Sequence, residues 1–229
     1  MNVISYFNLI PDFKFSSESQ KLIDVWKKSW QEHGWNTILL DESYARNNPL
    51  FDKSDLNNPD ANFYKTIPSS RWQYHRSCYC RLLAYCQYVR ENGDTLYSDY
   101  DVINYGFEPK ILSSTEPNSL FCGTRCVVFL GQDGIRDIER VIYNFSKNTF
   151  QETLDAGSSN DMRIMNKYTT TFSLKLDENG KRYSSNIFPD FSNRTPLVHY
   201  DGGCYKRGVN KNMSRLEIVK KYENDLPQT

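Results

Sequence analysis

The first forty residues are arranged as strand, helix, strand, and this order constrains the fold more than any other feature of the chain. Residues 2–7 and 35–40 are β-prone. Between them a helix begins at a capping residue, Ser16 or Ser17, and is closed by His33-Gly34. Its apolar side chains recur at helical spacing: Leu22, Ile23, Val25, Trp26 and Trp30. Two strands joined through a helix typically lie parallel in one sheet, so we predict an α/β fold with a central, mostly parallel sheet flanked by helices.

Further elements follow the same patterns along the chain. A second helix runs from Trp72 or Ser77 to Glu91, and its expected buried face is Tyr79, Leu82, Leu83, Cys86 and Val89. One or two strands are expected within residues 119–130, followed by a turn at 131–134 because two glycines flank it. The later helices are expected over 135–148 and 158–168, with a short charged helix ending near Tyr222.

Turn and loop residues divide the rest of the chain. Residues 43–70 are rich in Asn, Asp and Pro, which predicts an extended loop with short helical pieces. Asn179-Gly180 separates two β-prone segments, 172–176 and 182–188, and predicts a small antiparallel hairpin near the C-terminus. Neither an internal repeat nor a linker is present, so we expect a single domain over residues 1–229.

Charge and hydropathy exclude two classes of partner. Lys and Arg together number 28, as do Asp and Glu, so the formal net charge is zero and no basic excess favours nucleic acid. No apolar stretch is long enough to cross a bilayer, and the start of the chain lacks the pattern of a signal peptide. We expect a cytoplasmic protein whose six cysteines are free thiols, while peripheral contact with a membrane stays open.

The short apolar run at residues 94–103 ends in Asp99-Tyr100-Asp101, an Asp-x-Asp sequence. Where a strand ends in a loop, strict alternation stops and both carboxylates can turn toward one ion. Carboxylate oxygens suit Mg²⁺ or Mn²⁺, which are commonly held by one or two carboxylates together with substrate phosphates. The alternative interpretation is an ordinary polar turn, because Asp is frequent in turns.

Several common catalytic motifs are missing, and this directs attention to the late histidine. The chain has no Gly-x-Gly-x-x-Gly after the first strand, no Walker-type lysine loop and no Gly-x-Ser-x-Gly elbow. His199 precedes Gly202-Gly203 and Lys206. Imidazole binds Mn²⁺, glycines admit a phosphate close to the backbone, and lysine neutralises its charge. A hydrogen-bonded histidine beside a plain glycine turn is the competing interpretation.

These motifs together resemble the nucleotide-sugar glycosyltransferases of the GT-A (Rossmann-like) fold, of the glycogenin and lipopolysaccharide-galactosyltransferase type. The resemblance is carried by Cys80-Arg81-Leu82-Leu83, by Tyr97-Ser98-Asp99-Tyr100-Asp101-Val102, and by the late histidine with its glycines and lysine. The segment Asp161-Met162-Arg163-Ile164-Met165-Asn166 is similar to the family's Asp-Gln-Asp-x-Leu-Asn, with Met162 and Arg163 as departures. Lys206 matches only if Gly203 is the family's glycine, and the family's Asn-x-Gly keeps only Gly123.

The resemblance implies a role for each matching residue. Asp99, Asp101 and His199 would be the ligands of Mn²⁺ or Mg²⁺. The nucleotide-sugar donor, a UDP-sugar in this type, would be bound by Asp99, Tyr100, Gly203 and Lys206. Arg81 and Asp161 would be the catalytic pair, with Arg81 reaching the sugar nucleotide and Asp161 the sugar or acceptor. Residues 1–103 would form the nucleotide-binding half and residues 104–229 the half for the sugar and acceptor.

The activity that the resemblance implies is hexosyl or pentosyl transfer to a glycan or another hydroxyl acceptor, with a preference for retention of configuration. Two other functions compete with it. A nucleotidyltransferase that makes nucleotide sugars would need a glycine-rich basic loop after the first strand, and residues 8–12 lack one. A non-catalytic carbohydrate-binding domain is compatible with 14 % aromatic residues, but that function gives no reason for Asp99, Asp101 and His199 together.

Overall fold

A six-stranded central sheet organises the structure. The computed structural model describes residues 1–10, 16–61, 64, 71–122, 125–147, 161–186, 195–200 and 213–225. The strands are β1 (Asn2–Tyr6), β2 (Asn36–Leu40), β3 (Thr95–Ser98), β5 (Ser119–Leu120), β6 (Val127–Leu130) and β7 (Ser173–Leu174), in the order β2-β1-β3-β6-β5-β7. Three of the five neighbouring pairs are parallel, β1 with β2, β1 with β3 and β5 with β7, so the predicted mostly parallel sheet is confirmed.

The helices match the predicted periodicity closely. They are α1 (Ser16–Gln31), α3 (Trp72–Asn92), α4 (Gln132–Ser146), α5 (Asp161–Tyr168) and α6 (Arg215–Asp225). Short pieces are α2 (Glu42–Asn47) and the 3-10 helices η1 (Asp52–Ser54) and η3 (Pro109–Ser114). All five residues expected on the buried face of α3 are buried. The expected loop over 43–70 does contain helical pieces, α2 and η1, in its described part.

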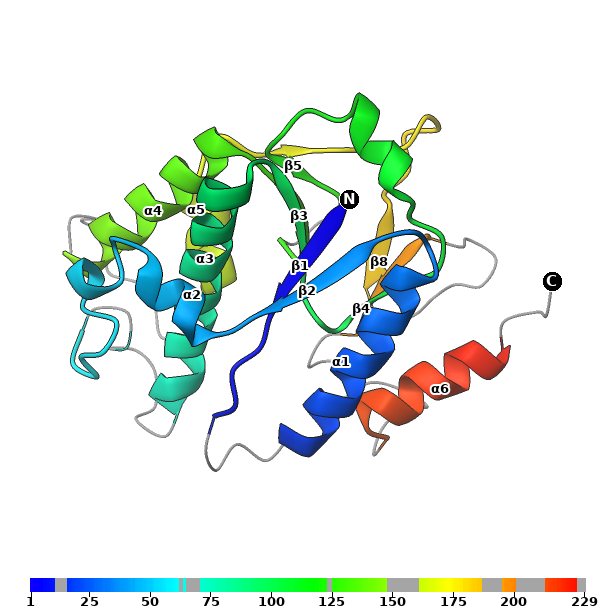
Figure 1. The fold of residues 1–229 in the computed structure, drawn as a ribbon, viewed down its shortest axis with the longest axis horizontal. Helices are drawn as coiled ribbons and strands as arrows, with labels where there is room; N and C mark the ends of the chain where they lie inside the picture. Colours follow the sequence, from blue (N-terminus) through cyan, green and yellow to red (C-terminus); the bar gives the residue numbers. More distant parts are fainter. Residues whose placement is uncertain are drawn as a thin grey trace.

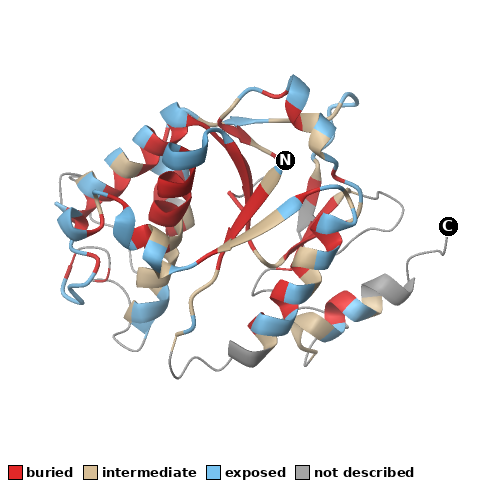
Figure 2. Cartoon of the chain, in the orientation of Figure 1, coloured by how far each residue is buried: buried red, intermediate tan, exposed pale blue. Residues whose placement is uncertain are grey.

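Helices cover both faces of the sheet, as Figure 1 shows, with α2 to α5 on one side and α1 and α6 on the other. The strands explain this arrangement, because successive side chains point to opposite faces. Val3 and Leu96 pack among the tryptophans of α1, whereas their neighbours Ile4 and Tyr97 pack against α3 and α4. Figure 2 shows the same division, with buried residues along the strands and the inner helix faces. The predicted α/β architecture is therefore confirmed.

One predicted turn is wrong. Residues 131–134 form the start of α4, with Gly131 in an extended conformation at its N-cap. The two glycines are needed for close packing instead. A Cβ on Gly134 would lie 2.1 Å from Asn118 Oδ1, and a Cβ on Gly131 would lie 2.6 Å from Pro117 Cβ. Glycine spacing indicated a turn, but the contact that requires glycine lies on another segment and has no local signature.

A second, three-stranded sheet lies beside the first. It contains β4 (Val102–Asn104), β9 (Leu197–His199) and β8 (Ser184–Asn186), in the order β4-β9-β8. Strand β9 runs antiparallel to β4 and parallel to β8. This sheet matters for the site because β4 continues directly from the Asp-x-Asp loop and β9 ends in His199.

The predicted C-terminal hairpin is present at its turn and opens beyond it. Asp177 N–H donates to the Lys181 carbonyl at 2.8 Å, Gly180 has the left-handed φ of 73°, and Leu176 pairs antiparallel with Arg182. The two arms then diverge, since β7 pairs with β5 in the central sheet and β8 pairs with β9 in the small one. Residues 187–188 of the second predicted arm lie outside the described residues. In the described part of the chain, no helix combines the length and the apolar character needed to cross a bilayer.

Candidate metal site

The Asp-x-Asp loop lies where β3 ends, at the carboxyl edge of the parallel strands β1 and β3. Asp99 N–H donates to the Cys126 carbonyl at 2.7 Å, which fixes the end of the strand. Val102 N–H then donates to the Asp99 carbonyl at 3.0 Å and closes a turn. The turn interrupts the alternation of the strand, so Asp99 and Asp101 lie within reach of one ion. Ligands of open α/β sheets bind at this edge.

Two tryptophans of α1 donate hydrogen bonds to this loop and to the end of the strand before it. Trp30 Nε1 donates to the Val102 carbonyl at 3.0 Å, and Trp26 Nε1 donates to Ser98 Oγ at 3.4 Å. Both rings are fully buried. The apolar stripe that identified α1 in the sequence therefore also supplies the donors that position the loop.

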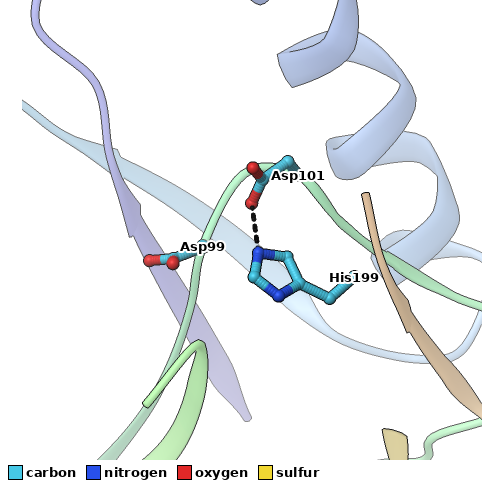
Figure 3. A group of neighbouring side chains, drawn as sticks. All are labelled: Asp99, Asp101 and His199. Atoms are coloured by element: carbon cyan, nitrogen blue, oxygen red, sulfur yellow. Dashed lines mark ion pairs between the residues drawn. The ribbon is translucent and has the colours of Figure 1, made fainter. Parts of the chain in front are cut away.

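Strand β9 brings His199 to the loop across a long stretch of sequence. The register pairs His199 with Val102, and Tyr200 N–H donates to the Asp101 carbonyl at 2.8 Å. His199 Nε2 lies 3.3 Å from Asp101 Oδ1, and Figure 3 shows the two side chains facing each other. The sequence could suggest a late histidine, but only the pairing of β4 with β9 decides that His199 meets the two aspartates.

Asp99, Asp101 and His199 form a group that could bind a metal ion. One ligand atom from each residue lies within 4.8 Å of those of the other two. The side chains are 11 %, 13 % and 11 % exposed, in that order. Two carboxylates and an imidazole are a donor set that suits Mn²⁺. His199 Nδ1 is also buried without a hydrogen-bond partner among the described residues, so this ring has one nitrogen available for a further ligand.

Arg81 joins the loop to α5. From α3 its Nη1 lies 2.8 Å from Asp99 Oδ1, and its Nη2 lies 2.8 Å from Asp161 Oδ2. Asp161 is the first residue of α5 and is almost fully buried. Thus five residues that the sequence singled out, Arg81, Asp99, Asp101, Asp161 and His199, are brought together. Arg81 Nε has no partner among the described residues, although it is buried.

A second arginine at the loop was missed by sequence reasoning. Arg215 Nη1 lies 2.9 Å from Asp101 Oδ2, and each side chain is 13 % exposed. Arg215 opens α6, which the sequence indicated only as a short charged helix. No spacing or motif around Arg215 distinguishes it from the other basic residues there, so the sequence offers no signal that could have found it.

The charges of this cluster shift its pKa values in opposite directions. Burial raises the pKa of Asp99 to about 6, although Arg81 opposes the shift. Burial also acts on Asp101, but the neighbouring His199 and Arg215 outweigh it and hold the pKa of that carboxyl below its usual value. Burial disfavours the imidazolium, yet Asp101 and Asp99 raise the pKa of His199 to about 9. Without a metal, His199 is therefore charged at neutral pH, and binding a cation there releases its proton.

The remaining predicted site residues divide into two cases. Tyr100 lies between the two aspartates, half-buried, with its ring edge-to-face on Phe7 at 5.6 Å between centroids. Gly203 and Lys206, predicted for the diphosphate, lie outside the described residues. The sequence did not single out Cys122 and Cys126 as a pair, and their sulfurs lie 2.8 Å apart.

Comparison with known proteins adds little to this geometry. No protein-family model matches the chain, and no curated protein matches it. Three chains of solved structures match. One is the crystal structure of a glycosyltransferase involved in the glycosylation of the major capsid of PBCV-1, with 14 % identity, coverage of 97 % of this chain and 98 % of that one, and a TM-score of 0.42. At this similarity the match carries no weight for activity or site roles.

Proposed function

We propose that this protein is a metal-dependent glycosyltransferase that moves a sugar from a nucleoside-diphosphate sugar, a UDP-sugar, to a hydroxyl of a glycan or another acceptor. The observation that supports the proposal most is the meeting of Asp99, Asp101 and His199 at the carboxyl edge of β1 and β3. Those residues come from distant parts of the chain and form a donor set for Mn²⁺ or Mg²⁺.

Glycosyl transfer requires such a site to stabilise negative charge on the leaving group. As the bond between C1 of the sugar and the diphosphate oxygen breaks, negative charge develops on the leaving diphosphate. A bound Mn²⁺ would supply Lewis-acid stabilisation of that charge. Asp99, Asp101 and His199 would hold the ion, and Lys206 with the backbone at Gly203 would bind the diphosphate in this proposal.

Arg81 and Asp161 are assigned to the sugar side of the site. The ion pair between them leaves Asp161 almost fully buried and already engaged with a cation. A carboxylate at this position can accept hydrogen bonds from sugar hydroxyls. Retention of configuration, the outcome that the family resemblance favours, is part of this proposal.

The proposal divides the chain into two halves. Residues 1–103 include β1, α1, β2, α3, β3 and the Asp-x-Asp loop, and would bind the nucleotide, with Tyr100 beside it. Residues 104–229 would shape the sugar and acceptor subsites. His199 and Asp161 come from this second half, so the proposed donor site requires both.

A ligand screen with a mutational control tests the proposal. Thermal unfolding is measured with UDP, GDP and CDP sugars, with and without Mn²⁺, and turnover is followed by release of the nucleotide. We expect one nucleotide sugar to stabilise the protein only with the metal, and Asp99→Asn to lower turnover by at least about a hundredfold. Asp133→Asn, an exposed carboxylate on α4, is the matched control.

Other results would favour the competing functions. Pyrophosphate release from a nucleoside triphosphate and a sugar phosphate would indicate a nucleotidyltransferase. Stabilisation by free sugar alone, unchanged in Asp99→Asn, would indicate a carbohydrate-binding domain. Full metal-dependent turnover in Asp99→Asn would refute the proposed metal site.

A further inference from the structure

Arg215 contacts the candidate metal site from the C-terminal helix α6. It is the first residue of α6, and its guanidinium shares Asp101 with His199. Arg215 lies on Oδ2 of the carboxylate, and His199 faces Oδ1. Each carboxylate oxygen of Asp101 therefore has a basic side chain opposite it.

The position of Arg215 is fixed by the packing of α6 on α1. Ile218 and Val219 are fully buried in the core cluster that contains Leu22 and Trp26. The N–H of Leu216 donates to Glu18 Oε1 at 3.2 Å, which ties the first turn of α6 to the start of α1. Because the side chains of Arg215 and Asp101 are both largely shielded from water, their ion pair differs from a mobile ion pair on the surface.

The two arginines of the site divide its acidic groups between them. Arg81 contacts Asp99 and Asp161, and Arg215 contacts Asp101. A guanidinium beside Asp101 repels a divalent cation that approaches the same carboxylate. The same guanidinium attracts the negative charge of a diphosphate. Arg215 therefore acts in opposite directions on the two ligands of the proposed reaction.

We propose that Arg215 is a positioning residue that makes the site prefer a divalent ion together with a nucleoside diphosphate over the ion alone. It holds Asp101 through Oδ2 and leaves Oδ1 directed toward His199, and its charge weakens binding of the bare metal. This inference rests on the proposed function. It adds that the metal binds tightly only together with the nucleotide. The C-terminal helix thereby becomes part of donor recognition.

Calorimetric titration of the full chain separates the two effects. Mn²⁺ is titrated alone, and UDP is then titrated at saturating Mn²⁺, into wild type, Arg215→Met, Arg215→Lys and Lys220→Met. Lys220 is exposed on the same helix, so its variant removes one charge without touching Asp101. For Arg215→Met we expect Mn²⁺ alone to bind about tenfold more tightly and UDP about tenfold more weakly.

The controls define the outcomes that decide the inference. Lys220→Met should match wild type in both titrations, and Arg215→Lys should keep most of the preference because it keeps the charge. If Arg215→Met matches Lys220→Met, or if it binds both ligands more weakly and also melts at a much lower temperature, the inference is overturned. A wild type that binds neither Mn²⁺ nor UDP would refute the proposed function itself, and this inference would fall with it.

Discussion

Replacing Arg81 with methionine would leave two carboxylates in the interior without the cation that lies between them. The guanidinium makes ion pairs of 2.8 Å with both Asp99 and Asp161. The three side chains are 18 %, 11 % and 4 % exposed, in the order Arg81, Asp99, Asp161. Methionine keeps part of the apolar stem and removes all five N–H donors, so the substitution mainly removes charge and hydrogen bonds.

The structure sets the size of the expected effect. Removing one partner of a buried ion pair costs roughly 3–5 kcal/mol, because the other charge stays buried without compensation. Asp99 still has His199 nearby, so we take the lower end, about 3 kcal/mol. For a chain of this length each kcal/mol shifts the melting temperature by about 2–4 °C, which gives a decrease of roughly 6–12 °C at pH 7.

Equilibrium unfolding in urea and thermal melts at pH 7 test this value. The matched control is Arg136→Met on α4, whose ion pair with Asp133 is 71 % and 66 % exposed, and which should cost less than about 1 kcal/mol. Asp161→Asn in the Arg81→Met background should recover part of the loss by removing one of the two carboxylates. Equal stability of Arg81→Met and Arg136→Met would refute the argument that Arg81 compensates buried charge.

Three further predictions concern metal binding, pH and packing. Mn²⁺ should raise the melting temperature of wild type in a concentration-dependent way, and Asp101→Asn should abolish that rise; an unchanged rise would exclude Asp101 as a ligand. Arg76, whose guanidinium lies 2.7 Å and 2.8 Å from the Glu42 oxygens, lowers the pKa of Glu42 from 4.5 to about 2. The contribution is present above pH 4.5 and is lost as the pH falls toward 2, so the gap in unfolding free energy between wild type and Glu42→Gln should shrink over that window; a constant gap would contradict it. Gly134→Ala should destabilise by about 1–3 kcal/mol in urea unfolding, because its Cβ would meet Asn118, and Arg136→Ala at an exposed position of the same helix is the control.

Local sequence patterns determined the main helices of this protein and the Asp99–Asp101 pair of its candidate metal site. The helical spacing of Leu22, Trp26 and Trp30 was enough to place α1, and the helical face of α3 was equally clear. Asp99 and Asp101 could be read as a ligand pair because they follow directly from the end of a strand. These features depend on neighbouring residues, and the periodicity of the backbone converts sequence spacing into a shared face.

Contacts between distant segments were decided by the tertiary structure alone. Arg81 and Asp161 entered through motif resemblance, and His199 through the glycines and lysine that follow it. Their distances from the loop follow from the pairing of β4 with β9 and the packing of α3 and α5. Gly134 looked like a turn residue because its close neighbour, Asn118, lies on another segment. Arg215 carried no signal, since an ion pair depends on where two charges meet in space and its spacing from Asp101 in the chain is arbitrary.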